Sequence, residues 1–202
     1  RHAAKRLVLL FALGILYNHG WGTGIPLSFD EIRYASVLGR IGIAWFVAMM
    51  LVWYVGIRLQ WTFACGILMG YWLLLSFVTL GGYGGGDYTN TGALNAWFDQ
   101  HLLPGIRYQG LAIDPEGILS NLNSVVNALV GVFAGRHMIK HREAPYLLLG
   151  HFVIAGLLLV ALGYAWDMVF PINKTLWTSS FVLVTLGYSL LLLAIFYYLI
   201  DV

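Results

Sequence analysis

Two polar segments stand out because each leads directly into an apolar stretch long enough to cross a membrane. The first runs from Asp114 to Ser124 and the second from Pro171 to Ser180. Together they hold carboxylates, amides, hydroxyls and a lysine, in a chain of which only 10% of the residues are charged. Charge is costly in hydrocarbon and is kept there for binding or chemistry. We therefore expect the functional site where these two helices start.

The first segment has the pattern of a helix start. Asp114 suits the N-cap, Pro115 the first helical position and Glu116 the first turn, where the helix dipole favours negative charge. Small polar residues then recur at helical spacing and form one polar stripe: Ser120, Asn123, Ser124, Asn127 and Gly131. Such a stripe either bonds to a neighbouring helix or lines a water-filled cavity, and for the stripe as a whole we favour the cavity.

The second segment contains a lysine at an unusual place. Asn173 or Thr175 is positioned to cap the last apolar helix, so Lys174 opposes the dipole of that helix. A lysine there calls for a carboxylate or an anionic ligand, unless its side chain simply extends to the membrane interface. The acidic residues expected on the same membrane side are Asp114, Glu116 and Asp167.

Other polar residues are less decisive. Arg40, at the start of an earlier apolar stretch, is either an anion ligand or an interfacial anchor. His19 and His101 are placed for acid–base chemistry, but neither has a spaced partner, so we expect no metal site. We interpret His137 and His141 as surface residues of a basic cytoplasmic segment and His151 as a packing residue.

Composition defines the class of protein. The 202 residues are 60% hydrophobic, with a mean hydropathy of +0.79, which excludes a soluble domain. The chain lacks the alternating pattern of an outer-membrane barrel, and its single cysteine, Cys65, excludes an internal disulfide. We predict an all-α polytopic membrane helix bundle that forms one domain over 1–202, with membrane lipid and no nucleic acid as a partner.

Six apolar stretches approach the length of about 20 residues that a bilayer requires: 7–25, 38–57, 61–80, 117–139, 146–166 and 176–200. The longest connection is an outer loop at about 81–115. If the first stretch enters from the cytoplasm, seven of the 11 Lys and Arg residues lie inside and four outside. Both ends are then cytoplasmic and both polar segments lie outside. Pairs of glycines at Gly66 and Gly70 and at Gly131 and Gly135 are expected to pack helices closely.

Three motifs in this order resemble the heparan-α-glucosaminide N-acetyltransferase family of multi-span membrane acyltransferases and its bacterial members. They are Val37-Leu38-Gly39-Arg40-Ile41, then Asp114-Pro115-Glu116-Gly117 followed by Asn123-Ser124-Val125-Val126, and finally Pro171-Ile172-Asn173-Lys174-x-Leu176-Trp177-Thr178-x-Ser180. The family pattern usually has Gln where this chain has Gly39. Family members are longer, so the resemblance implies that 1–202 is the central portion of a family domain.

The resemblance implies an enzyme that takes an acetyl group from cytoplasmic acetyl-CoA and passes it to a sugar amine or hydroxyl outside. The acceptor would be a glycan or glycolipid and the location a bacterial inner membrane, while a homo-oligomer stays open. Basic residues of the cytoplasmic side, namely Arg136, Lys140 and Arg142, would attract the phosphates of the donor. The histidine regarded as catalytic in the family lies in helices that precede the matched region, and nothing in this chain aligns with it.

We accordingly expect two groups of site residues. Supporting catalysis would be Asp114, Glu116, Asn173 and Lys174, and binding substrate or cofactor would be Arg40, Asn123, Ser124, Asn127, Trp177 and Thr178. The alternative is a membrane transporter or flippase that uses the same polar-lined path without acyl chemistry. Labelled acetyl-CoA separates the two, because a transporter leaves the thioester intact.

Overall fold

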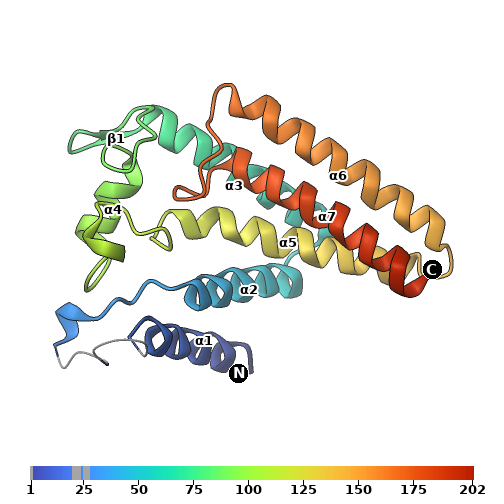
Figure 1. Ribbon diagram of the computed structural model, residues 1–202, viewed down its shortest axis with the longest axis horizontal. Coiled ribbons are helices and arrows are strands. Elements are labelled where there is room, and N and C mark those ends of the chain that lie inside the picture. The colour runs from blue at the N-terminus through green and yellow to red at the C-terminus, as the bar shows by residue number, and fades with distance from the viewer. Residues whose placement is uncertain (1, 20–23, 25–27) are drawn as a thin grey trace.

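The computed structural model describes residues 2–19, 24 and 28–202 and is an all-α bundle with very little sheet (Figure 1). The long helices are α1 (His2–His19), α2 (Val37–Tyr54), α3 (Ile57–Phe77), α5 (Ser120–Lys140), α6 (Pro145–Asp167) and α7 (Ser179–Asp201). Each overlaps one of the predicted apolar stretches. The predicted fold class, a polytopic membrane helix bundle, is confirmed, and the chain is an integral membrane protein.

The count of six spans is only partly met. Among the described residues, four helices are both long and apolar enough to cross a membrane: α2, α3, α6 and α7. Lys5 and Arg6 lower the hydropathy of α1, and the polar stripe lowers that of α5. Residues 20–23 and 25, which the first predicted stretch includes, lie outside the described residues.

The helices alternate in direction, so the connections gather at two ends of the bundle (Figure 1). Helix α5 lies centrally and contacts α2, α3 and α7, while α1 packs on α2 and α6 packs on α7. The N- and C-terminal ends lie toward the same end of the bundle as the α5–α6 turn. The loops that hold both polar segments lie at the opposite end, which we call the outer end.

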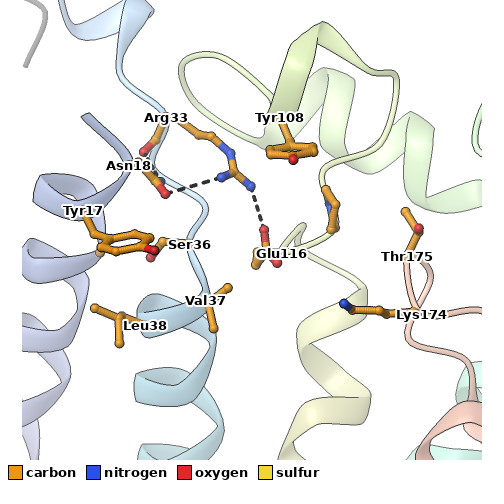
Figure 2. Close-up of a pocket in the computed structure, with 12 residues that line it drawn as sticks. Tyr17, Asn18, Arg33, Ser36, Val37, Leu38, Tyr108, Glu116, Lys174 and Thr175 are labelled. Carbon is orange, nitrogen blue, oxygen red and sulfur yellow. Dashed lines mark hydrogen bonds and ion pairs between the residues drawn. The ribbon is translucent and has the colours of Figure 1, made fainter. Parts of the chain in front are cut away.

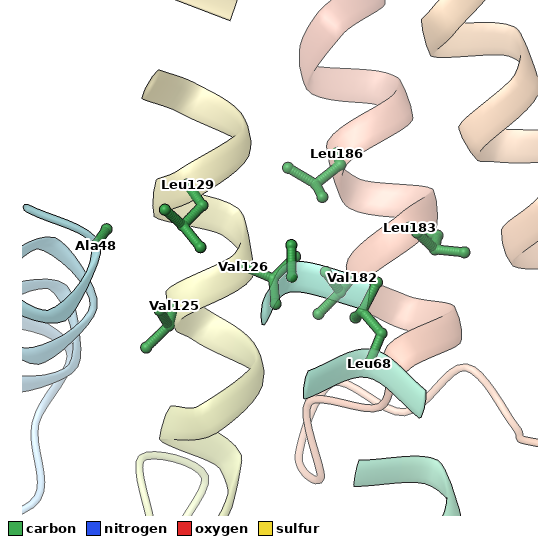
Figure 3. Packing of buried hydrophobic residues seen from close by; sticks show 9 residues of the cluster. Ala48, Leu68, Val125, Val126, Leu129, Val182, Leu183 and Leu186 are labelled. Carbon is green, nitrogen blue, oxygen red and sulfur yellow. The ribbon is translucent and has the colours of Figure 1, made fainter. Parts of the chain in front are cut away.

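The core between the central helices is apolar. Side chains from α2, α3, α5 and α7 meet there, and Val126, Leu129 and Val182 are almost completely buried (Figure 3). Burying an aliphatic side chain of this size stabilises a fold by about 1.5–3 kcal/mol in water. In a membrane, close packing and van der Waals contact between helices replace much of that hydrophobic term.

Close helix packing occurs at glycines other than the predicted ones. A Cβ placed at Gly66, Gly70, Gly131 or Gly135 would meet nothing within 4 Å, so these residues do not bring helices of this chain together. Helices α6 and α7 approach at Gly156, Gly163 and Gly187 instead. A Cβ at Gly187 would lie 2.7 Å from the carbonyl oxygen of Gly156. The spacing of glycines alone does not reveal which face of a helix meets a neighbour.

The predicted outer loop at about 81–115 has a structure of its own. It contains most of a small hairpin of β1 (Thr79–Leu80) and β2 (Tyr83–Gly84), followed by α4 (Leu94–Leu102) and a 3₁₀ turn, η2 (Tyr108–Gly110). A second 3₁₀ turn, η1 (Phe29–Glu31), precedes α2. Leu94, Ala96 and Ile113 are buried against the outer end of α3 and against Phe170. The loop is therefore a packed cap that can hold the first polar segment in place.

Candidate functional site

Only the last part of the first polar segment is helical, because α5 begins at Ser120 and the residues from Asp114 to Leu119 precede it. The carboxylate of Asp114 caps a tight turn instead, accepting hydrogen bonds from the backbone N–H of Glu116 at 3.0 Å and of Tyr108 at 2.8 Å. The prediction that Asp114 and Pro115 open the helix is therefore wrong. Contacts with residues of the cap hold Asp114 and its neighbours in a loop conformation. These contacts come from residues outside the segment, so the local sequence does not predict them.

Asp99, on α4, makes the decisive contacts. Its buried carboxylate accepts from the N–H of Asp114 at 3.1 Å and of Ile118 at 2.9 Å. Gly117 lies so close that a Cβ there would collide with the Asp99 carboxylate. Burial raises the pKa of Asp99 to about 6, against the lowering effect of these two hydrogen bonds. Sequence analysis missed this residue. Its only signal was that it is an acidic residue within the predicted outer loop at about 81–115.

Arg33 joins the segment before α2 to the first polar segment. Its guanidinium lies 2.7 Å from Asp114 Oδ1 and 2.6 Å from Glu116 Oε2, and its Nε donates to Asp114 Oδ2 at 3.0 Å. Burial lowers the pKa of Arg33, but the hydrogen bonds and charges of the two carboxylates outweigh it and raise the pKa above its usual value. The ring of Tyr108 lies 4.8 Å from the guanidinium carbon. Sequence analysis had counted Arg33 only as an outer charge.

Arg40 connects the two polar segments. Its side chain is buried and donates hydrogen bonds through Nη2 to the carbonyl of Pro115 and the hydroxyl of Ser120. The guanidinium carbon also lies 4.2 Å from the centre of the Trp177 ring, which is within the range of a cation–π contact. An interfacial anchor would reach into the headgroups, so this buried placement disfavours the anchor interpretation of Arg40, and a role in binding an anion stays a prediction.

The second polar segment forms a turn before α7. Neither Asn173 nor Thr175 caps that helix, which begins at Ser179 with Thr178 as its N-cap residue and no side-chain capping bond. Asn173 Oδ1 accepts from the N–H of Thr175 at 2.8 Å and of Leu176 at 3.1 Å instead. The capping prediction is therefore wrong. Trp177, just before α7, has a left-handed backbone (φ 55°), so a continuous helix cannot run through it and α7 begins after it.

Thr178 and Trp177 fix this turn. The Thr178 hydroxyl donates to the carbonyl of Pro171 at 2.8 Å and accepts from the N–H of Asn173 at 3.0 Å. The indole N–H of Trp177 donates to Asn127 Oδ1 at 3.2 Å. The two residues therefore hold the turn between α6 and α7 in one shape, and Trp177 ties it to α5.

The polar stripe of α5 bonds to its neighbours. Asn123 Nδ2 donates to the carbonyl of Trp177 at 2.8 Å and to Ser179 Oγ of α7 at 3.2 Å, whereas Ser124 Oγ bonds within α5, to the carbonyl of Asn121. Two pockets lie at this end of the bundle and are described below. Neither is lined by Asn123, Ser124 or Asn127. Of the two interpretations left open above, these contacts favour hydrogen bonding between helices over a water-filled cavity.

An outer pocket of about 630 Å³ lies between the two polar segments and α1 (Figure 2). Glu116, from the segment before α5, and Lys174, from the segment before α7, line it together with Arg33, Tyr17 and Asn18. Lys174 is exposed and forms no salt bridge within the part of the chain that the structure describes. Of its predicted partners, Asp114 pairs with Arg33, and Asp167 accepts from the N–H of Ile172 at 2.6 Å.

An inner pocket of about 540 Å³ runs into the bundle and shares Ser36 and Glu116 with the outer one. Arg40 and Asn121 are among its few polar lining residues. The rest of its wall is mainly apolar and comes from α1, α2 and α5, with side chains such as Phe11, Ile43, Val47 and Val125. The predicted polar route is therefore an apolar pocket with polar groups at its outer mouth.

The two outer histidines lie outside both pockets. His19 Nε2 accepts from the N–H of Arg33 at 2.9 Å, and the His101 ring stacks on Trp97 with ring centroids 4.7 Å apart. Within residues 2–19, 24 and 28–202, no three His, Cys, Asp or Glu side chains are arranged to hold a metal ion. The geometry thus offers charged binding groups around Glu116, but assigns neither histidine a chemical role there.

The chain is similar to two curated proteins along almost all of its length. It is 30% identical to human heparan-alpha-glucosaminide N-acetyltransferase and 29% identical to the mouse protein of the same name. Each match covers 98% of this chain but 38% of the relative, so the chain spans well under half of the relatives' length. No protein-family model matches the chain. Across nearly its whole length, this chain is therefore a relative of the heparan-alpha-glucosaminide N-acetyltransferase family.

Proposed function

We propose that this chain is the acceptor-binding part of an integral membrane acetyltransferase of a bacterial inner membrane. In this proposal acetyl-CoA is supplied from the cytoplasm, and the acetyl group passes to an amine or hydroxyl of a glycan or glycolipid on the extracytoplasmic side. The names of the relatives support acetyl transfer to a sugar amine. The observation that carries the proposal here is the outer pocket, whose wall at Glu116 is shared with the apolar inner pocket.

The charged groups of the outer pocket suit a polar acceptor. Glu116 presents a carboxylate that can accept hydrogen bonds from sugar hydroxyls or an amine, and Lys174 reaches into the same space with a free ammonium group. Arg33 and Asp114 hold Glu116 in place from behind. Fixing the acceptor in this way lowers the entropic cost of bringing it to the acyl carbon.

The inner pocket suits the acyl donor. Its wall is mainly apolar and can pack against the aliphatic part of the donor's flexible arm, and its mouth at Glu116 and Arg40 is polar. Bound acetyl-CoA would supply the activated acetyl group. The residues of this chain would hold the arm, exclude water from the thioester and keep the acceptor beside it. The resemblance assigns proton transfer to a histidine without a counterpart in this chain.

The test is acetyl transfer from labelled acetyl-CoA to glucosamine-terminated acceptors by the full-length protein in sealed membrane vesicles. Glu116→Gln and Lys174→Ala should each lower kcat/KM at least about tenfold, since each removes a charged contact to the acceptor worth about 1.4 kcal/mol or more. Glu31→Gln is the matched control, because Glu31 is an exposed acid in η1 that does not line the pocket. Unchanged turnover in both pocket variants would remove this pocket from the mechanism.

The same vesicles test the transporter alternative. Acetyl transfer consumes the thioester, so label appears on the acceptor and free CoA accumulates. Movement of substrate across the membrane with the thioester intact would contradict the proposal and favour a transporter or flippase.

A further inference from the structure

Three histidines come together at the end of the bundle opposite the outer pocket. His137 lies in the last turn of α5, His141 is the C-cap residue of that helix, and His151 comes from α6. His137 Nε2 and His151 Nδ1 are 2.9 Å apart, and the ring centroids of His137 and His141 are 4.2 Å apart. His151 is therefore not the lone packing residue that the sequence indicated. We call these residues the histidine cluster.

The cluster stands at the mouth of an apolar groove of about 420 Å³ between α5 and α6, which we call the α5–α6 groove. His137 and His151 line the groove together with side chains such as Val130, Ala155 and Leu158. Trp61 of α3 and Phe133 of α5, which stack with ring centroids 4.2 Å apart, also line it. Because α3 and α6 have the length and hydropathy of membrane spans, the open side of this groove faces lipid tails.

The mouth of the groove is rich in groups that carry or accept positive charge. Lys140 follows His137 by about one turn at the end of α5, and across the described part of the chain no carboxylate forms a salt bridge with Lys140 or with a member of the cluster. Arg136 donates to Gln60 at 3.0 Å, while Arg142 lies 3.9 Å from Glu143. An anionic group would complement this mouth.

We propose that the α5–α6 groove binds one anionic phospholipid. The phosphate would accept a hydrogen bond from the one imidazole N–H that the His137–His151 hydrogen bond leaves free, with Lys140 as a counter-charge, and one acyl chain would fill the groove. A free phosphate or nucleotide could bind the histidine cluster, but it would make no contact with the apolar walls of the groove. The continuity of the cluster with those walls therefore favours a lipid. This inference does not depend on acetyl transfer at the outer end.

Native mass spectrometry of the full-length protein, released from detergent, tests the proposal. Phosphatidylglycerol and phosphatidylcholine with identical acyl chains are compared at equal concentration. We expect one phosphatidylglycerol to stay bound and phosphatidylcholine to be lost. His137→Gln combined with His151→Gln should reduce retention about tenfold, because a charge-assisted hydrogen bond to the phosphate is lost. His101→Gln, a histidine on the outer α4, is the matched control and should retain the lipid.

A second variant tests the apolar half independently. Ala155→Trp fills the groove and leaves the cluster intact, so it should also release phosphatidylglycerol. If the histidine variant fails to fold, this variant and the headgroup preference of the unaltered protein decide the question. Equal retention of the two lipids, retention in both variants, or displacement of phosphatidylglycerol by soluble CoA or pyrophosphate would each overturn the proposal.

Discussion

Asp99 lies outside the helices that are long and apolar enough to span a membrane, and its surroundings disfavour the charged form of its carboxyl group. Its side chain is buried, and no cation lies within ion-pair distance of it among the described residues. The folded protein therefore binds the Asp99 proton more tightly than the unfolded chain, with a pKa of about 6 against 3.8. The stability that this protonation contributes is complete below pH 3.8 and is lost as the pH rises through about 6.

We predict that Asp99→Asn removes this pH dependence. Between pH 4 and pH 7 the unaltered protein should lose on the order of 2 kcal/mol of unfolding free energy that the variant does not lose. Thermal unfolding in detergent at several pH values measures the difference between the two proteins. We compare how steeply the unfolding free energy of each protein changes with pH. This comparison removes the pH-independent loss of stability caused by replacing a carboxylate oxygen with an amide NH₂. Parallel curves for the two proteins would contradict the assignment.

Asp114 is predicted to be the most sensitive residue of the ion-pair group. It is fully buried and bonds Arg33 through both oxygens, so Asp114→Asn leaves a partly buried guanidinium with Glu116 alone. We expect a loss of roughly 3 kcal/mol of unfolding free energy, toward the lower end for a broken buried pair. The exposed Asp30→Asn serves as the control in the same melting experiment and should change little. An equal, small effect of both substitutions would show that the pair does not stabilise the fold.

At the scale of elements, the sequence predicted where helices occur but not where two of them start. Apolar length located α5 and α7 because that property is carried by the residues themselves. Their starts at Ser120 and Ser179 depend on Asp99 from the cap and on the left-handed Trp177, and neither is a local signal. The same limit explains the glycines, since only the assembled bundle shows which of them face a helix.

The glycines of the α6–α7 contact give a prediction at this scale. Gly187→Ala should destabilise the protein by about 1–3 kcal/mol, because the new Cβ would lie 2.7 Å from the Gly156 carbonyl and 2.8 Å from the Val160 nitrogen. Gly66→Ala is the matched substitution in α3, where nothing lies within 4 Å. It should be neutral or stabilise by up to about 1 kcal/mol through helix propensity. Thermal melting should therefore show a lower melting temperature for Gly187→Ala and an unchanged or higher one for Gly66→Ala, and equal shifts would contradict the packing.

At the scale of the whole molecule, the two proposed sites lie at opposite ends of the bundle. The outer pocket and both polar segments lie at one end, and the histidine cluster lies at the other. Motifs in the sequence located the outer residues Glu116, Lys174 and Arg40. They did not locate Arg33 or Asp99, because the partners of these residues are distant in the chain and only the fold brings them together.

This arrangement predicts the accessibility of each end in the membrane. With Cys65 replaced by serine, a cysteine at Glu31 should react with a membrane-impermeant maleimide added outside intact cells, and a cysteine at Glu143 should react only after the membrane is opened. Both acids are exposed and neither lines the outer pocket. The reverse pattern would invert the proposed orientation and move the acceptor site to the cytoplasm.

The shared ion pair of Arg33 has a consequence for how the pocket responds to its contents. One guanidinium, carried on the segment that leads into α2, pairs with two carboxylates on the segment before α5 and so offsets only one of their two negative charges. Any cation that approaches Glu116 from the pocket competes with Arg33 for the same oxygens. A cation bound in the pocket therefore weakens the ion pair that joins these two segments. Thermodynamic reciprocity then requires the converse. Whatever separates the α1–α2 hairpin from α5 increases the affinity of Glu116 for a cationic guest by the same factor.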